Sequence, residues 1–310
     1  MSSVVIEEVV TEDYTAYNGD SCEVIQGMPS DSIGFMVYSP PFADLFSYSD
    51  NLACMSNCKN DTEFFEHYKY LIGELYRVLK PGRIAAVHVM QLTKSMQRDG
   101  VIGLRDFRGD VIRAHESCGF IYHSEVCIWK CPVVAVTRTK ALGLLHKQLT
   151  KDSSRSRQGL ADYVVVFRKP GVNDTPIDGP LDHYAGEDFT PSGGNLSIDI
   201  WQHYASPVWM DIRQGRTLNN YREGKDDGDV RHLAPLQLDV IERCLQLWSA
   251  EGDVVLSPFM GIGSEGVCSI AAGRKFIGIE LKKSYFDLAV KNLAKAKVKA
   301  GKTSLFDGEV

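Results

Sequence analysis

The apolar positions of this chain follow two periods: short unbroken runs, and longer stretches in which apolar residues recur every three or four positions. Unbroken runs at residues 33–38, 84–89 and 163–167 are typical of buried strands. Between the first two runs, residues 61–80 have the spacing of an amphipathic helix that ends before Pro81. Strands that alternate with helices predict a doubly wound α/β sheet.

The alternation is interrupted twice and then resumes towards the carboxyl terminus. Periodicity is lost over residues 131–160 and again over residues 171–231. The remaining pattern predicts helices at 107–118, 236–248, 266–272 and 285–299, and strands at 121–129, 253–256 and 276–280. Because an irregular loop as long as 171–231 is unusual inside a compact sheet domain, we expect it to be a functional insertion.

The composition is typical of a globular protein that stays inside the cell. At 310 residues, the chain is long enough for one large α/β domain with an insertion. It has no run of 18 apolar residues and no basic-then-apolar segment at its start, so neither a membrane span nor secretion is predicted. We therefore expect its eight cysteines to be reduced thiols.

The first candidate site is the turn Ser39-Pro40-Pro41-Phe42, which follows the predicted strand 33–38. The two prolines stop the strand, because neither ring nitrogen can donate to a ladder. The turn presents a hydroxyl, backbone carbonyls and an aromatic ring at the edge of the sheet where α/β proteins bind ligands. A flat ring that bears an NH2 group would suit these partners. An ordinary turn between a strand and a loop is the alternative.

The second candidate site follows the predicted strand 253–256. Glycines at 261, 263 and 266 open a helix, and the next strand ends in Glu280. The glycines allow a backbone to approach a ligand closely, and an acid at a strand end can accept from ribose hydroxyls. This pattern is typical of a nucleotide-binding βαβ unit, and on its own it would also allow a dinucleotide.

Together, Ser-Pro-Pro-Phe near the start and Pro-Phe-Met-Gly-Ile-Gly near the end resemble the β class of amino-group DNA methyltransferases, which use S-adenosylmethionine. The resemblance covers most of the chain and is to the solitary or prophage type. It implies a Rossmann-like, doubly wound, mostly parallel seven-strand sheet in which the two motif strands are neighbours. It divides the chain into a catalytic half at 1–170, a target-recognition insertion at 171–231 and a cofactor half at 232–310.

The resemblance implies a catalytic function for the Ser39 turn. The Ser39 hydroxyl and the Pro40 carbonyl would accept hydrogen bonds from the target amine and favour a tetrahedral nitrogen in the transition state. Pro41 completes the turn. Phe42, with Tyr38 or Tyr48, would stack on a base that has been flipped out of the duplex.

The resemblance also implies a set of cofactor contacts around the glycine-rich loop. As alternatives, Asp20 is a helix N-cap, Phe259 belongs to the core, Glu280 is an N-cap and His232 lies on the surface. The residues expected to bind S-adenosylmethionine are Asp20, His232, Pro235, Ser257, Phe259, Gly261, Gly263 and Glu280.

The target base is predicted from two features that disagree. Many relatives carry Asp at the positions of Ser39 and Ser257, and Ser-Pro-Pro is commoner with cytosine-N4 targets. The overall layout, however, is similar to prophage-type enzymes, many of which modify adenine. We expect adenine-N6 methylation, with cytosine-N4 as the alternative. A catalytically silent DNA-binding protein and an amino-group methyltransferase for RNA or protein are two further alternatives.

Positive charge gathers in the two irregular stretches, although the net charge is −6. We expect residues 131–160 to form a basic loop, flexible at 153–157, that contacts phosphates, with a solvated surface loop as the alternative. The insertion 171–231 mixes arginines with aromatics, which can read or stack on bases. The predicted DNA contacts are Arg138, Lys140, Lys147, Lys151, Arg155, Arg157, Arg213, Arg216, Asn219 and Arg222.

The expected partner is double-stranded DNA, in the cytoplasm of a prokaryote or with a phage as the source of the gene. The resemblance suggests a homodimer, and no membrane is expected. Neither Cys54-x3-Cys58 nor Cys127-x3-Cys131 has the usual zinc-ligand spacing, so no metal is expected.

Overall fold

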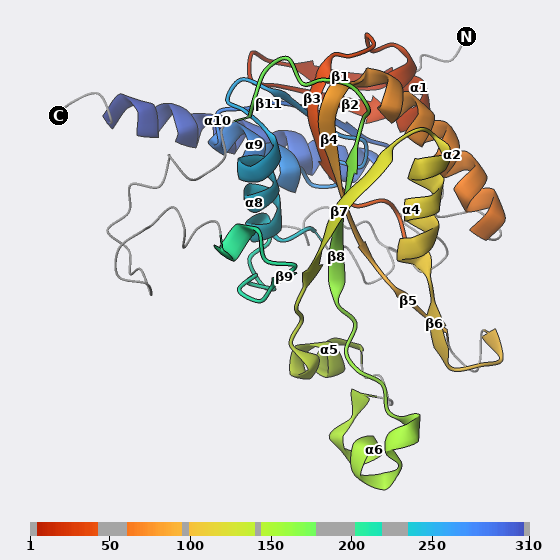
Figure 1. Cartoon of the computed structure of the whole chain (residues 1–310). Helices are drawn as coiled ribbons and strands as arrows, with labels where there is room; N and C mark the ends of the chain where they lie inside the picture. The colour runs from red at the N-terminus through yellow and green to blue at the C-terminus, as the bar shows by residue number, and fades with distance from the viewer. Residues whose placement is uncertain are drawn as a thin grey trace.

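A computed structural model describes residues 5–42, 61–94, 99–139, 144–177, 202–218 and 235–306. Within these residues, nine strands form one sheet in the order β1-β2-β11-β10-β3-β4-β8-β7-β9 (Figure 1). The strands are β1 Val5–Val10, β2 Tyr14–Gly19, β3 Ile33–Tyr38, β4 Leu79–Met90, β7 Ile121–Ile128, β8 Asp162–Arg168, β9 Val208–Trp209, β10 Val254–Ser257 and β11 Lys275–Glu280. A separate ribbon pairs β5 Leu92–Lys94 with β6 Gly103–Arg105.

Helices cover both faces of the sheet. One core lies under α1, α2 and α4, and the other under α8, α9 and α10 (Figure 1). The helices are α1 Ser21–Gln26, α2 Asp61–Val78, α4 Phe107–Ser117, α5 Pro132–Thr139, α6 His146–Lys151, α8 Leu238–Trp248, α9 Ser264–Ala271 and α10 Lys283–Phe306. Because apolar residues meet a helical layer on each face, β3 is buried along its whole length.

The predicted doubly wound, mostly parallel sheet is confirmed. β2, β11, β10, β3 and β4 run parallel to one another, while β1 is antiparallel to β2, and β8 is antiparallel to both β4 and β7. The sheet is wider than the seven strands that the resemblance implied, because β1 and β9 add an edge strand on either side. One boundary also differs: the strand after α2 begins at Leu79, so it includes Pro81 and Gly82, which were expected to separate helix from strand.

The order of the strands reverses between β3 and β10. The two strands are paired in parallel, with Phe35 opposite Val255 and Met36 opposite Leu256. From β3 the chain passes through α2 to β4, and from β10 it passes through α9 to β11 on the other side. Their carboxyl ends therefore open next to each other, at the kind of switch point where α/β sheets bind ligands.

The basic stretch 131–160 is not an irregular loop throughout, as the sequence predicted. It contains α5, α6 and a 3-10 turn at Ser153–Arg155, and α5 and α6 lie beyond the ends of β7 and β8 (Figure 1). The carboxylate of Asp152 accepts from the Ser154 N–H at 3.1 Å and so caps the 3-10 turn. None of the described helices is long and apolar enough to cross a membrane.

Candidate active site

A single cavity lies at the switch point between β3 and β10, and it is lined by residues from both halves of the chain. The Ser39 turn forms one wall, and the loop after β10 with the end of β11 forms the other. The predicted site residues that line it are Ser39, Pro40, Pro41, Phe42, Asp20, Pro235, Phe259, Gly261 and Glu280. The remaining lining residues are Ser21, Leu236, Pro258, Met260, Ile262, Ser264, Glu265, Ile279, Leu281 and Tyr285.

The Ser39 turn packs against a layer of buried aromatic residues. Phe42 is 9% exposed and meets Phe107 edge-on, with ring centroids 6.0 Å apart. Tyr38 is fully buried, and its hydroxyl lies 3.1 Å from His115 Nε2. The prediction that Tyr38 could stack on a base is therefore wrong, because the last residue of β3 points into the core. Tyr48 lies outside the described residues.

The opposite wall is built around the Glu280 carboxylate at the end of β11. Oε2 accepts from the Gly261 N–H at 2.9 Å, and Oε1 accepts from the Lys282 N–H at 2.9 Å. Asn18 on β2 donates to the Glu280 carbonyl at 2.8 Å and fixes the strand end. Gly261 has φ +54°, a left-handed conformation that favours glycine. The carboxylate is thus fixed beside the cavity with lone pairs left over.

Asp20 is both a helix N-cap and a residue of the cavity lining. Its side chain accepts from the Cys22 N–H at 2.7 Å and caps α1, and the same residue lines the cavity. Two of the predicted cofactor residues do not line the cavity: Ser257 is fully buried beneath the loop, and Gly263 is the N-cap of α9 with φ +88°. His232 lies outside the described residues.

Besides the predicted Asp20 and Glu280, the cavity contains one carboxylate that the sequence did not single out, Glu265. Burial raises the pKa of Glu280 to about 7, although the N–H groups of Lys282 and Gly261 oppose this rise. Burial also raises the pKa of Glu265, in the first turn of α9, to about 8, and the charge of Glu280 adds to the rise. Glu265 is only 5% exposed. Its position between Gly263 and Gly266 is the one feature of the sequence that could have identified it.

The described lining fits the proposed cofactor. It includes three carboxylates, Asp20, Glu265 and Glu280, but no Lys, Arg or His. The buried Ser264 hydroxyl lines the same cavity and has no hydrogen-bond partner among the described residues, so a ligand could satisfy it. Apolar walls with carboxylates suit a cationic ligand with hydroxyl donors, which describes S-adenosylmethionine, and they do not suit the pyrophosphate of a dinucleotide. When bound, S-adenosylmethionine supplies an electrophilic methyl group.

The predicted DNA contacts of the basic stretch are placed on its short helices. Lys147 and Lys151 lie on α6 and are exposed, and the side chain of Arg155 is 80% exposed. Arg157 is half-buried, and burial lowers the pKa of its guanidinium. Arg138 lies in α5, where the side chains are not described at that position, and Lys140 lies outside the described residues.

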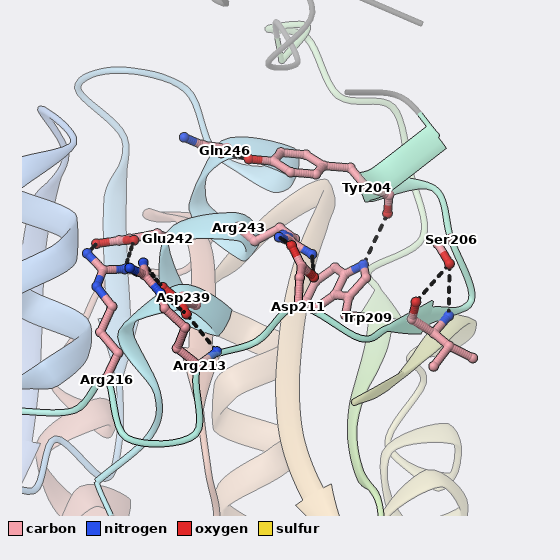
Figure 2. A network of polar contacts seen from close by, with 11 residues as sticks. Tyr204, Ser206, Trp209, Asp211, Arg213, Arg216, Asp239, Glu242, Arg243 and Gln246 are labelled. Atoms are coloured by element: carbon pink, nitrogen blue, oxygen red, sulfur yellow. Dashed lines mark hydrogen bonds and ion pairs between the residues drawn. The ribbon is translucent and has the colours of Figure 1, made fainter. Parts of the chain in front are cut away.

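Residues 202–218, the longer of the two described parts of the insertion, are tied to α8 by ion pairs. Figure 2 shows Arg213 and Arg216 facing the acidic residues Asp239 and Glu242. Arg213 donates to Asp239 Oδ1 at 2.6 Å, and Arg216 pairs with both acids. Because these charges are already paired, both arginines hold this segment onto the domain. Asn219 and Arg222 lie outside the described residues.

The aromatic residues of the same segment also have structural contacts. Trp209 is 1% exposed, because β9 pairs with β7 and places its ring in the core. The guanidinium of Arg243 lies 4.9 Å from the Trp209 ring and 4.8 Å from the Tyr204 ring (Figure 2). The expectation that Trp209 reads or stacks on bases is therefore wrong for this arrangement.

No cluster of three or more His, Cys, Asp or Glu side chains is placed to hold a metal ion within the described ranges. Cys54 and Cys58 lie outside those ranges. Cys127 and Cys131 both carry free thiols.

The sheet topology, the switch-point cavity and its carboxylates define a methyltransferase of the Rossmann-like class. Comparison with known families identifies it further: residues 33–291 match the N6_N4_Mtase model, described as DNA methylase. The chain belongs to this family of amino-group DNA methyltransferases, and its cofactor is S-adenosylmethionine.

Curated relatives match most of the chain. The type II methyltransferase M.Cfr9I of Citrobacter freundii is 30% identical over 90% of this chain and 87% of its own length. The DNA adenine methyltransferase YhdJ of Escherichia coli is 23% identical over 90% of this chain and 82% of its own length.

Solved structures share the fold. The cytosine-N4-specific PvuII DNA methyltransferase has a TM-score of 0.64 at 17% identity, over 98% of this chain and 97% of that one. A Thermus thermophilus protein assigned as a DNA modification methylase, in complex with S-adenosyl-L-methionine, has a TM-score of 0.64 at 20% identity, over 92% and 94% of the two chains. The fold and the family therefore agree, while the target base is left open.

Proposed function

We propose that this chain methylates the exocyclic amine of a base in duplex DNA, with adenine N6 as the favoured target. The observation that carries the proposal is that the Ser39 turn and the Glu280 carboxylate line one cavity. An amine inside a base stack cannot reach a cavity between two strand ends, so the target base has to be flipped out.

The Ser39 turn would activate the amine. The lone pair of an exocyclic amine is delocalised into its ring, which makes the nitrogen a poor nucleophile. Hydrogen bonds to the Ser39 hydroxyl and the Pro40 carbonyl would favour a tetrahedral nitrogen whose lone pair can attack. Pro41 stiffens the turn, and Phe42 supplies an apolar wall for the base. Because the two walls belong to one cavity, the amine and the methyl group would be held close together.

The opposite wall would orient the cofactor. Glu280 would accept from the ribose hydroxyls, Gly261 would allow close approach, and Phe259 and Pro235 would provide apolar contacts. Asp20 would accept from the donors at one end of the cofactor. Ser257 and Gly263 would act indirectly, by shaping the loop.

The exposed cations of α6 and the 3-10 turn would contact phosphates. Lys147, Lys151 and Arg155 lie on a part of the molecule that extends beyond β7 and β8, next to a single acid, Asp152 (Figure 1). A homodimer acting on DNA in a prokaryotic cytoplasm is part of the proposal, and light scattering at several concentrations tests the dimer.

Methyl transfer from labelled S-adenosylmethionine to random-sequence duplex DNA, followed by nucleoside analysis, tests the proposed function. We expect the label in N6-methyladenine. Label in N4-methylcytosine would show that cytosine, and not adenine, is the target base. The observation that favours this second candidate is the serine at position 39, where many relatives have aspartate. No label with cofactor binding intact would favour RNA or protein as the substrate. Loss of both activities would favour a silent DNA-binding protein.

A further inference from the structure

Behind Ser39, on the side away from the cavity, lies a histidine. Ser39 Oγ is 3.2 Å from His88 Nδ1 and 3.1 Å from the His88 carbonyl oxygen. His88 lies near the carboxyl end of β4, is 8% exposed and does not line the cavity. The contact with the Ser39 hydroxyl is therefore a route by which the imidazole can act on a ligand in the cavity.

The other ring nitrogen of His88 faces a buried carboxylate. His88 Nε2 lies 3.2 Å from Asp162 Oδ2, and Asp162 is 2% exposed at the start of β8. Lys130, just after β7, donates from Nζ to Asp162 Oδ1 at 2.8 Å. The antiparallel pairing of β4 with β8 brings these residues together, although they are far apart in sequence.

The surroundings of Asp162 favour its ionised form. Burial alone would raise the pKa of this carboxyl, but the nearby His88 ring and the charge of Lys130 outweigh burial and lower it. An anion that faces Nε2 favours the tautomer in which Nε2 carries the hydrogen. Nδ1 then has a free lone pair that points at the Ser39 hydroxyl.

Methylation of an exocyclic amine produces a nitrogen that has to lose a proton. We propose that His88, oriented by Asp162 and Lys130, accepts this proton through the Ser39 hydroxyl; the proposal rests on the proposed function. His88 is thereby a positioning residue for Ser39 that also takes up the proton, and Ser39 is the residue that touches the amine.

The atoms balance as follows. The N–C bond forms while the bond between the methyl carbon and the sulfonium sulfur breaks, which leaves a neutral thioether. The amine proton passes to Ser39 Oγ as the Ser39 proton passes to His88 Nδ1. The resulting imidazolium keeps its Nε2 hydrogen and faces the Asp162 carboxylate, which stabilises its charge. Release of the proton to solvent restores the neutral ring.

Other titratable groups face this chain of contacts from β7, β8 and α4. Cys127 on β7 and Tyr163 on β8 both interact with the charge of Asp162, and burial raises the pKa of each. Arg108 on α4 pairs with Glu125 on β7 at 2.9 Å, and its guanidinium lies 4.5 Å from the Tyr163 ring. Of these groups, His88 is the one that contacts the Ser39 hydroxyl.

A second buried histidine provides an internal contrast. His115 lies against Tyr38 and the Val111 carbonyl, and it stacks on Phe167 with centroids 3.9 Å apart. Among the described residues no hydrogen bond or ion pair joins it to a carboxylate, and burial lowers its pKa to about 3. A histidine that serves only the core is therefore kept neutral here, whereas His88 is given a hydroxyl on one side and a carboxylate on the other.

The kinetic test measures single-turnover methyl transfer at saturating cofactor, so that cofactor binding does not limit the rate. His88→Gln can hydrogen-bond Ser39 but cannot take a proton. We expect a rate about 100-fold lower and an unchanged cofactor affinity. His123→Gln, at an exposed position on β7, is the matched control and should keep both values. A wild-type rate in His88→Gln would overturn the proposal.

Non-additivity gives a second kinetic readout. If His88 acts through Ser39, adding His88→Gln to Ser39→Ala should lower the rate by less than threefold, because the route is already broken. A full additional loss of about 100-fold would show that His88 acts independently and would contradict the proposal.

A spectroscopic readout does not depend on activity. Long-range proton–nitrogen spectra of protein labelled in histidine report which ring nitrogen carries the hydrogen, and His88→Gln assigns the signal. We expect the Nε2–H tautomer in the wild type and the Nδ1–H tautomer in Asp162→Asn, whose amide can donate to Nε2. An Nδ1–H tautomer in the wild type would overturn the inference. Absence of methyl transfer to DNA by the wild type would instead refute the proposed function, and the tautomer would still decide on His88.

Discussion

The two walls of the cavity are assembled from the chain in different ways. The cofactor wall comes mainly from one continuous unit, β10 to the start of α10, with Asp20 added from the end of β2. The amine wall is the Ser39 turn, which is backed by His88 and Asp162, so its residues and their supports come from three separate strands. The cofactor wall is therefore formed mainly by residues that are close together in the sequence. The groups around Ser39, in contrast, are brought together only by the pairing of strands in the sheet.

The walls also differ in their chemistry. The cofactor wall has carboxylates whose pKa values burial has raised, which suits a cation that arrives from solvent. The amine wall has a hydroxyl connected to an imidazole and an ionised carboxylate, which suits the movement of a proton. This difference predicts that changes on one wall affect binding and changes on the other affect the chemical step.

Among single substitutions on the two walls, Ser39→Ala is expected to have the largest effect. Loss of the hydroxyl removes an acceptor that is used as the nitrogen becomes tetrahedral, so single-turnover transfer should fall about 100- to 1,000-fold. Cofactor affinity, measured by calorimetry, should stay within about threefold, since Ser39 lies on the other wall. Ser32→Ala removes a hydroxyl at the opposite end of β3 and should change neither value. An unchanged turnover in Ser39→Ala would remove Ser39 from its role.

The next effect is expected from Glu280→Gln. The neutral amide keeps one acceptor but loses the charge that strengthens hydrogen bonds to ribose hydroxyls, so cofactor affinity should fall about 10- to 100-fold. Turnover at saturating cofactor should stay within about threefold. If the affinity were normal and the saturated rate low, Glu280 would belong to the chemistry, and the division between the walls would be wrong.

A smaller effect is expected from the titration of Glu265. In the free folded protein its pKa is about 8, above the usual value for glutamate, so the folded state binds more protons than the unfolded state between these values. The stability of the free protein should therefore fall as the pH rises towards 8. A cationic ligand favours the ionised carboxylate, so cofactor affinity should rise over the same range, with protons released.

Glu265→Gln removes this titration and leaves that of Glu280. Calorimetry in two buffers of different ionisation enthalpy counts the protons released on cofactor binding, and the variant should release fewer than the wild type. Its affinity should change several-fold less between about pH 6 and pH 8.5. An identical proton count would mean that Glu265 does not titrate with the cofactor.

The smallest effect concerns the region outside both walls. Arg155→Ala combined with Arg157→Ala should weaken DNA binding several-fold and reduce the slope of log affinity against log salt by about one to two. Arg113→Ala, an exposed arginine on α4 that pairs with Asp110, is the matched control. An unchanged slope in the double variant would make the basic stretch an ordinary solvated surface.

The sequence predicted the elements well where periodicity was strong and contacts were local. The strands β3, β8, β10 and β11 and the helices α4 and α8 lie within about two residues of their expected ranges. The prediction did less well at residues 131–160, where charge suggested a loop and short-range caps such as Asp152 build helical turns instead.

The site was predictable to the extent that it is written in contiguous motifs. The Ser39 turn and the glycine-rich loop identified both walls. His88 was not identified, because a single histidine in the apolar run 84–89 is typical of a core residue, and its pairing with Asp162 exists only once β4 lies beside β8. Trp209 was misjudged for the same reason: an aromatic in an irregular stretch gave no sign that β9 would join the sheet.

The central claim, that one wall binds the cofactor and the other acts on the amine, is tested most directly by one paired measurement. Cofactor affinity and single-turnover rate at saturating cofactor would be determined for Ser39→Ala, Glu280→Gln and the double variant. The account predicts that the affinity loss follows Glu280→Gln, the rate loss follows Ser39→Ala, and the double variant has both losses in full. Equal losses of affinity in the two single variants, or a saturated rate in Glu280→Gln as low as that in Ser39→Ala, would contradict it.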